Sequence, residues 1–208
     1  PESRRHVDAL VGAGLIEDAT KLWWDVRPSD RFPTLEMRIT DVCTWVDDAV
    51  AVAALYMCVL RMLYRLKKEN QRWRQYASML IEENRWRAQR YGLDEGLVDF
   101  GKGEIVPCTR LLEEIQELIH EDAEALGCTS EIGHLETIIK DGTSAHRQLA
   151  VYSVALSRGA SREEALIEEY PPADEMRCPV HFCVGQEAAP AALSVLLNTD
   201  DYLFSHHR

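Results

Sequence analysis

Two short segments near the start of the chain alternate apolar and polar residues. They cover residues 21–27 (KLWWDVR) and 34–40 (TLEMRIT), and a turn-rich stretch lies between them. Such alternation is typical of a half-buried β-strand, because successive side chains point to opposite faces. The pattern predicts two antiparallel strands joined by a loop, with Glu36, Arg38 and Thr40 on one face of the second strand.

A helical pattern replaces the alternation from Asp41 onward. The stretch 41–69 is apolar nearly all round between Val50 and Leu60. A helix of this kind is expected deep in a core. Asp41 or Thr44 is the expected N-terminal cap, because short polar side chains accept hydrogen bonds from the first free backbone amides.

Further helices and one hairpin are predicted along the rest of the chain. They are a helix over 71–91 stopped by Gly92, a hairpin of 97–100 and 104–106 around Gly101–Gly103, helices over 109–126, 130–140 and 144–157, and a last helix opened by a capping box at Ser161–Glu164. The predicted fold class is therefore α+β and mainly helical, with a short antiparallel sheet and a partial helical second unit at the end.

A proline-rich stretch, residues 170–174 (YPPAD), is the strongest linker signal in the second half. It predicts a domain over 1–170 and the beginning of a second one over 174–208. The 208 residues are enough for one real core and a small second unit. The chain starts with Pro1 and closes at Arg208 within an apparent element, so we expect it to be a piece of a longer protein.

The net charge of -12 argues against nucleic acid as a partner, because that partner requires a basic surface. We expect no apolar run of the roughly 20 residues that a membrane-spanning helix requires, and no leader pattern opens the chain. A soluble, cytoplasmic protein is the expectation. The cysteines are scattered without a CxxC pair, which favours thiols over a zinc site or disulfide framework.

Charged residues on the two predicted strands form the first candidate site. Glu36 and Arg38 lie two apart on one strand, and Asp25 and Arg27 repeat the same spacing on the other. A carboxylate is a hard ligand for Mg²⁺ or Mn²⁺, and an Arg side chain can grip phosphate with two hydrogen bonds. The alternative is a salt-bridge ladder on a solvated sheet face, which spacing alone favours.

A second candidate cluster lies near the end of the helix predicted over 71–91. Arg87, Arg90 and Tyr91 recur at helical spacing, and Glu83 precedes them on the same surface. These arginines could bind an anionic substrate. They could equally pair with acidic neighbours or with the carbonyls at the helix end, and spacing alone favours this second reading.

Several motifs in register resemble one family. They are 21–29 (KLWWDVRPS), 33–38 (PTLEMR) with Asp41, 83–92 (ENRWRAQRYG), and 141–144 (DGTS) with Arg147. In this order, over roughly residues 1–168, they resemble the C-terminal half of the carboxylate–amine ligase family related to type 2 glutamate–cysteine ligases.

The resemblance implies a glutamine-synthetase-like fold and an ATP-dependent ligase that joins a glutamate-like carboxylate to a cysteine-like amine through an acyl phosphate. It implies that Glu36 holds Mg²⁺ or Mn²⁺ with ATP, and that Arg38 is catalytic and stabilises the transferred phosphoryl group. The implied ATP- and substrate-binding residues are Asp25, Arg27, Asn84, Arg85 and Arg87. The family builds the rest of the site from an N-terminal half, so this chain alone is expected to be inactive. A core left exposed by the missing half would favour self-association.

The last segment, 177–208, is similar to the beginning of the alpha chain of thiamine-diphosphate-dependent 2-oxo acid dehydrogenases. The resemblance implies that His181, Gln186 and Arg208 contact thiamine diphosphate in the parent protein. It spans only about 35 residues, and a helical cap explains the same residues. Two alternatives therefore stay open for the chain: the leading region of such an oxidoreductase, and a non-catalytic scaffold.

Overall fold

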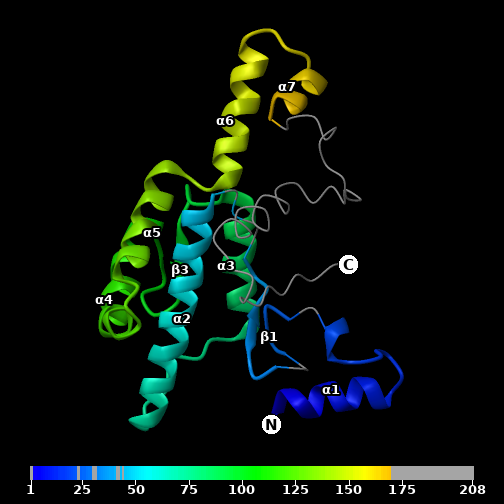
Figure 1. Ribbon diagram of the computed structural model, residues 1–208, viewed down its shortest axis with the longest axis vertical. Helices are drawn as coiled ribbons and strands as arrows, with labels where there is room; N and C mark the ends of the chain where they lie inside the picture. Colours follow the sequence, from blue (N-terminus) through cyan, green and yellow to red (C-terminus); the bar gives the residue numbers. More distant parts are fainter. Residues whose placement is uncertain (1, 23, 30–31, 41–42, 44, 170–208) are drawn as a thin grey trace, which may run out of the picture. The chain divides into compact units, whose positions relative to one another are not determined.

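The computed structural model of the chain describes residues 2–22, 24–29, 32–40, 43 and 45–169 (Figure 1). The chain divides into two compact units, Pro1–Asp41 and Val42–Arg208, and each is described by itself. The expected linker at 170–174 and the segment 174–208 lie outside the described residues. The domain boundary placed there stays a prediction.

The first unit contains a helix, a single turn and a two-stranded sheet. Their bounds are α1 (Glu2–Gly12), the 3-10 turn η1 (Ala19–Lys21), β1 (Val26–Pro28) and β2 (Leu35–Met37). β1 and β2 pair antiparallel, as predicted, and Arg27 lies directly opposite Glu36. The alternating pattern therefore identified the pairing, whereas α1 was not among the expected elements.

The first predicted strand is wrong for most of its length. Its first residue, Lys21, belongs to η1, which the Asp18 side chain caps by accepting from the Thr20 amide at 2.7 Å. Residues 22, 24 and 25 lie in no helix or strand. Only Val26 to Pro28 then pair with β2. The polar cap is a local signal that competes with the alternation of apolar residues.

The long apolar helix, α2, covers Val46–Lys68 and begins later than predicted. Its N-cap is Trp45, which makes no capping hydrogen bond, so neither Asp41 nor Thr44 holds that position. Asp47 and Asp48 in the first turn instead complement the positive end of the helix dipole. Basic residues in the last turn complement the other end.

The core of the second unit forms where α2 packs against α4 (Cys108–Leu126) and α5 (Thr129–Asp141) (Figure 1). The residues that α2 contributes to this core recur every three or four positions, and they include small side chains that let the helices approach closely. The buried cluster consists of Ala51, Ala54, Cys58, Met62, Ile119, Ala123, Ile132 and Leu135. α2 is thus a core helix along this face.

α2 also corrects one sequence expectation. By length and composition alone, this helix is long and apolar enough to cross a membrane. The expectation that no segment reaches this length is therefore wrong for Val46–Lys68. A core helix passes the same test, and α2 packs against α4 and α5 along one face.

α3 (Ser78–Tyr91) begins later than predicted, but it stops at Gly92 as expected. Residues 71–77 are not helical, and the ring of Tyr76 packs on Phe100 with centroids 5.2 Å apart. The predicted hairpin is confirmed as β3 (Leu97–Asp99) and β4 (Glu104–Val106). Gly96 precedes it at φ +66°, where a Cβ atom would lie 2.4 Å from the Val106 carbonyl oxygen.

α6 (Ser144–Ser157) and α7 (Arg162–Glu169) pack together in the second unit. The predicted capping box opens α7: the Ser161 amide donates to the Glu164 carboxylate at 2.8 Å, and the Glu164 amide donates to the Ser161 hydroxyl at 3.2 Å. The described residues therefore confirm a mainly helical α+β chain, with two small antiparallel sheets instead of one.

Candidate functional site

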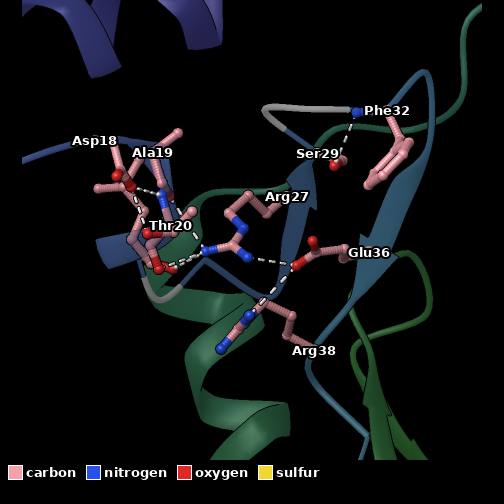
Figure 2. A network of polar contacts seen from close by, with 9 residues as sticks. Asp18, Ala19, Thr20, Arg27, Ser29, Phe32, Glu36 and Arg38 are labelled. Atoms are coloured by element: carbon pink, nitrogen blue, oxygen red, sulfur yellow. Dashed lines mark hydrogen bonds and ion pairs between the residues drawn. The ribbon is translucent and has the colours of Figure 1, made fainter. Parts of the chain in front are cut away.

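The first candidate site is a polar network built around Arg27 in the first unit (Figure 2). Arg27 is 5% exposed, and its Nη1 donates to the carbonyl oxygens of Ala19, Thr20 and Leu22 at 3.2, 2.8 and 3.2 Å. Its Nη2 donates to Glu36 Oε2 at 2.6 Å. The guanidinium thus fixes the turn before β1 and holds Glu36 on β2 in one orientation.

Arg38 reaches the same carboxylate from the neighbouring position on that strand face (Figure 2). Its Nη1 lies 3.3 Å from Glu36 Oε2, so one oxygen receives both guanidinium groups. Among the described residues, the hydrogen bonds and ion pairs of Glu36 with Arg27 and Arg38 all use Oε2, and none uses Oε1. The predicted shared face of Glu36 and Arg38 is confirmed, and so is the cross-strand ion pair that the alternative reading expected.

Asp25 lies just before β1, and its backbone carbonyl accepts from the Arg38 amide at 2.7 Å. This bond extends the pairing of β1 with β2 by one step. Asp25 is half-buried. Its assignment to a substrate pocket stays a prediction.

The charges of this network favour an anion. The side chains of Arg27, Glu36 and Arg38 together sum to one positive charge. Arg27 is buried and donates to the protein itself, so Arg38, whose side chain is 19% exposed, is the guanidinium of this set that suits phosphate oxygens. No group of three metal-ligating side chains occurs among the described residues. Mg²⁺ often takes only one or two protein carboxylates beside phosphate oxygens and water, so Glu36 with its open Oε1 fits as a single ligand.

The other candidates, Asn84, Arg85 and Arg87, lie on α3 in the second unit. Asn84 donates to the Val98 carbonyl at 2.9 Å and accepts from the Val98 amide at 2.8 Å. Arg87 donates to the Glu95 and Gly96 carbonyls at 3.1 and 3.4 Å. Asn84 and Arg87 therefore hold the turn into β3, and their contact with a substrate stays a prediction.

Arg85 lies on the same helix as these two residues and, like them, is half-buried. Its side chain is 38% exposed, and its Nη1 lies 3.8 Å from Glu82 one turn earlier. The expected gathering of Arg87, Arg90 and Tyr91 is confirmed, because both guanidinium carbons lie over the Tyr91 ring, at 5.4 and 6.0 Å from its centroid. This end of α3 carries a cationic surface.

Sequence reasoning missed a buried carboxylate, Asp48, at the start of α2. Asp48 is 4% exposed; its Oδ1 lies 2.8 Å from His134 Nε2 on α5, and its Oδ2 accepts from Arg147 on α6. The Arg147 guanidinium also lies over the Trp45 ring, 4.5 Å from its centroid. The only signal for this cluster was Arg147 beside the motif 141–144.

A cavity of about 300 Å³ lies in the second unit, next to the same motif. It is lined by Leu93, Asp94, Pro107, Cys108, Thr109, Ile139, Lys140, Asp141, Gly142 and His146. His146 is oriented by Thr143, whose Oγ1 lies 2.8 Å from His146 Nδ1. Burial raises the pKa of the Cys108 thiol, and Asp94 adds to this effect. The cavity therefore presents a neutral thiol and an oriented imidazole to a small molecule.

The expected thiamine-diphosphate residues, His181, Gln186 and Arg208, lie outside the described residues. A family model described as glutamate–cysteine ligase family 2 matches residues 1–170. This match ends before those three residues, and nothing in the comparisons supports a thiamine-diphosphate site.

Curated relatives match most of the chain. A protein of Rhodospirillum rubrum, named provisionally as glutamate–cysteine ligase 2, is 64% identical over 166 residues, which are 80% of this chain and 43% of that protein. Proteins with the same name from Jannaschia sp. and Sorangium cellulosum are 49% and 51% identical, over 79% and 72% of this chain. The chain spans less than half the length of these relatives.

Proposed function

Because the chain belongs to glutamate–cysteine ligase family 2, we propose that it contributes part of the active site of an ATP-dependent carboxylate–amine ligase. The observation that carries this proposal is the network of Arg27, Glu36 and Arg38, which lies within the matched residues and has a net positive charge. An acyl phosphate route needs such a site, because negative charge gathers on the transferred phosphoryl group.

In this reaction a carboxylate oxygen attacks the terminal phosphorus of ATP, and ADP leaves. An amine then displaces phosphate from the acyl phosphate, and an amide forms. No covalent bond to the protein is required, so the residues act by position and charge. Arg38 donates to the phosphoryl oxygens, while Arg27 fixes Glu36 and the turn beneath it.

Glu36 Oε1 is the position at which a divalent cation would bind this chain. The cation would neutralise charge on the ATP phosphates. The remaining ligands would come from the nucleotide, from water and from other parts of the ligase. Asp25, Asn84, Arg85 and Arg87 complete the proposed set of binding residues in this chain.

The relatives' name supports glutamate as the carboxylate and cysteine as the amine. The polypeptide of those relatives is more than twice as long as the matched segment. We therefore assign the rest of the pocket to the part of the ligase that this chain does not match, and we expect the 208 residues alone to be inactive.

The test uses a full-length ligase that contains this chain, with Mg²⁺, ATP and a panel of amino acids. Phosphate release should require both a carboxylate and an amine, and both Glu36→Gln and Arg38→Ala should lower it at least about 100-fold. Arg110→Ala is the matched control, because Arg110 forms an exposed ion pair with Glu113. Circular dichroism confirms that each variant is folded.

Two outcomes would contradict the proposal. Turnover within about twofold of the unsubstituted enzyme in both site variants would remove the network from the reaction. Failure of the folded full-length protein to bind ATP would favour a non-catalytic scaffold instead.

A further inference from the structure

Two cysteine side chains meet inside the core of the second unit. Cys58 lies in the buried stripe of α2, and Cys128 lies at the corner between α4 and α5. Their sulfur atoms are 3.5 Å apart, although the residues are 70 positions apart in the sequence. The sequence had favoured thiols here because the cysteines show no paired spacing, and only the packing of α2 on this corner brings them together.

We propose that Cys58 and Cys128 form a reversible disulfide when the protein meets a hydroperoxide, which makes this pair an oxidative modification site. A disulfide requires about 2.05 Å between the sulfur atoms, so they must approach by about 1.5 Å. Side-chain rotations with a small shift of the corner can provide this movement.

The two thiols differ in access and in acidity. Cys58 is fully buried, whereas Cys128 is partly exposed and is the sulfur that an oxidant reaches first. Burial, followed by the hydrogen bond with Cys128, raises the pKa of Cys58 to about 12. Cys58 therefore stays protonated at neutral pH and acts second.

The chemistry takes two steps. The Cys128 sulfur attacks one oxygen of the peroxide, and the O–O bond breaks. Cys128 becomes a sulfenic acid, and the other peroxide oxygen departs as water or an alcohol with the proton of the thiol. The Cys58 sulfur then attacks the Cys128 sulfur, the S–O bond breaks, and the departing hydroxide takes the Cys58 proton as water. Two thiols lose two electrons in total, and the peroxide gains them.

The disulfide would bind the middle of α2 to the α4–α5 corner. These elements form the buried core, with Met62, Ile119 and Ala123 in the same cluster. Oxidation should therefore alter the stability of the second unit, whereas oxidation of an exposed thiol elsewhere should not. Closure of a long loop is the arrangement in which a cross-link restricts the unfolded chain most.

The test treats the 208-residue chain with hydrogen peroxide, blocks the remaining thiols and maps the peptides by mass spectrometry. We expect a cross-linked peptide between Cys58 and Cys128 that dithiothreitol separates. We also expect the thermal midpoint of unfolding to rise by about 5 °C and to return on reduction. Both results should persist in Cys108→Ser, the control, because Cys108 is a partly exposed thiol outside the pair.

In Cys58→Ser, the Cys128 sulfenic acid has no resolving thiol and should be trapped by dimedone. If this variant does not fold, the peptide map of the unsubstituted chain still decides the matter. Recovery of Cys58 and Cys128 as thiols under conditions that oxidise Cys108 would overturn the proposal. A disulfide between Cys128 and any other cysteine would do the same.

Discussion

The guanidinium of Arg27 binds the protein's own backbone at three carbonyl oxygens and Glu36 at a fourth acceptor. Sequence spacing had offered two readings of Arg27 and Glu36, a phosphate-binding wall and a salt-bridge ladder. The geometry contains the cross-strand ion pair of the ladder. It also holds Glu36 beside Arg38 with its Oε1 unused by the described residues. The role of Arg27 in the proposed site is therefore to position other groups.

Arg27→Lys tests this positioning role. A lysine keeps the charge, but its single ammonium group cannot reach the carbonyls of η1 and Glu36 together. We expect the free energy of unfolding of the first unit to fall by about 1–2 kcal/mol, with faster amide hydrogen exchange in residues 19–28. Lys21→Ala is the control, because its ion pair with Glu17 is exposed and should contribute little. Equal exchange in the two variants would contradict the assignment.

Asp122 provides a prediction about pH. It is fully buried on α4 and accepts hydrogen bonds from Arg61 and Arg65 on α2. Burial raises the pKa of this carboxyl, but the hydrogen bonds and charges of Arg65 and Arg61 outweigh it, so the pKa lies below its ordinary value. Ionised Asp122 thus stabilises the fold above the unfolded pKa of about 3.9, and this contribution disappears as the pH falls through the lower folded pKa.

We expect Asp122→Asn to lower the free energy of unfolding by about 2 kcal/mol at neutral pH. The difference from the unsubstituted chain should shrink as the pH falls from about 5 towards 2. Urea titrations followed by circular dichroism at several pH values measure this, with Glu113→Gln as an exposed control. A deficit of constant size across this range would show that packing, and not charge, accounts for it.

Elements with local stop signals were predicted well from the sequence. α4 ends at Gly127, which adopts the left-handed conformation of a C-terminal cap, and α7 begins with a capping box at Ser161. The predictions failed where another contact decides the backbone conformation. Asp18 caps residues 19–21 as η1 through a polar contact, and the Tyr76 ring packs on the distant Phe100 in the non-helical stretch before α3. Periodicity does not record such contacts.

The candidate functional residues also divide into those placed by local pairing and those placed by distant contacts. Alternation placed Arg27, Glu36 and Arg38 together, because these residues lie on paired strands that are close in sequence. The cluster of Asp48, His134 and Arg147 could not be predicted, since His134 and Arg147 lie 86 and 99 residues after Asp48 along the chain. Only the packing of α2, α5 and α6 brings them together.

Asp48→Ala should destabilise the contact between these three helices. The substitution leaves the partly buried Arg147 guanidinium without its carboxylate, and its Nε already lacks a hydrogen-bond partner among the described residues. We expect a loss of about 3 kcal/mol in the free energy of unfolding, measured by urea titration. Asp47→Ala, one residue earlier and exposed, should cost less than about 1 kcal/mol. Similar losses in both variants would mean that only the helix dipole is affected.

At the scale of the whole molecule, α2 has a second apolar face that the described residues leave open. Val50, Met57 and Tyr64 recur every seven residues, so they lie on one side of the helix, and they are 37%, 53% and 60% exposed. The core stripe through Ala51 and Cys58 faces elsewhere. An apolar stripe of this length is typical of a surface that another protein segment covers.

The relatives' polypeptide beyond the matched segment is one source of that cover, and a second copy of this chain is another. We expect the 208 residues alone to self-associate through this face and to bind a hydrophobic dye. Tyr64→Lys should lower the association constant at least about tenfold in sedimentation velocity experiments. Gln71→Lys adds the same charge at an exposed polar position and should leave association unchanged. A chain that stays monomeric at about 100 μM without binding dye would mean that its own residues already cover this face of α2.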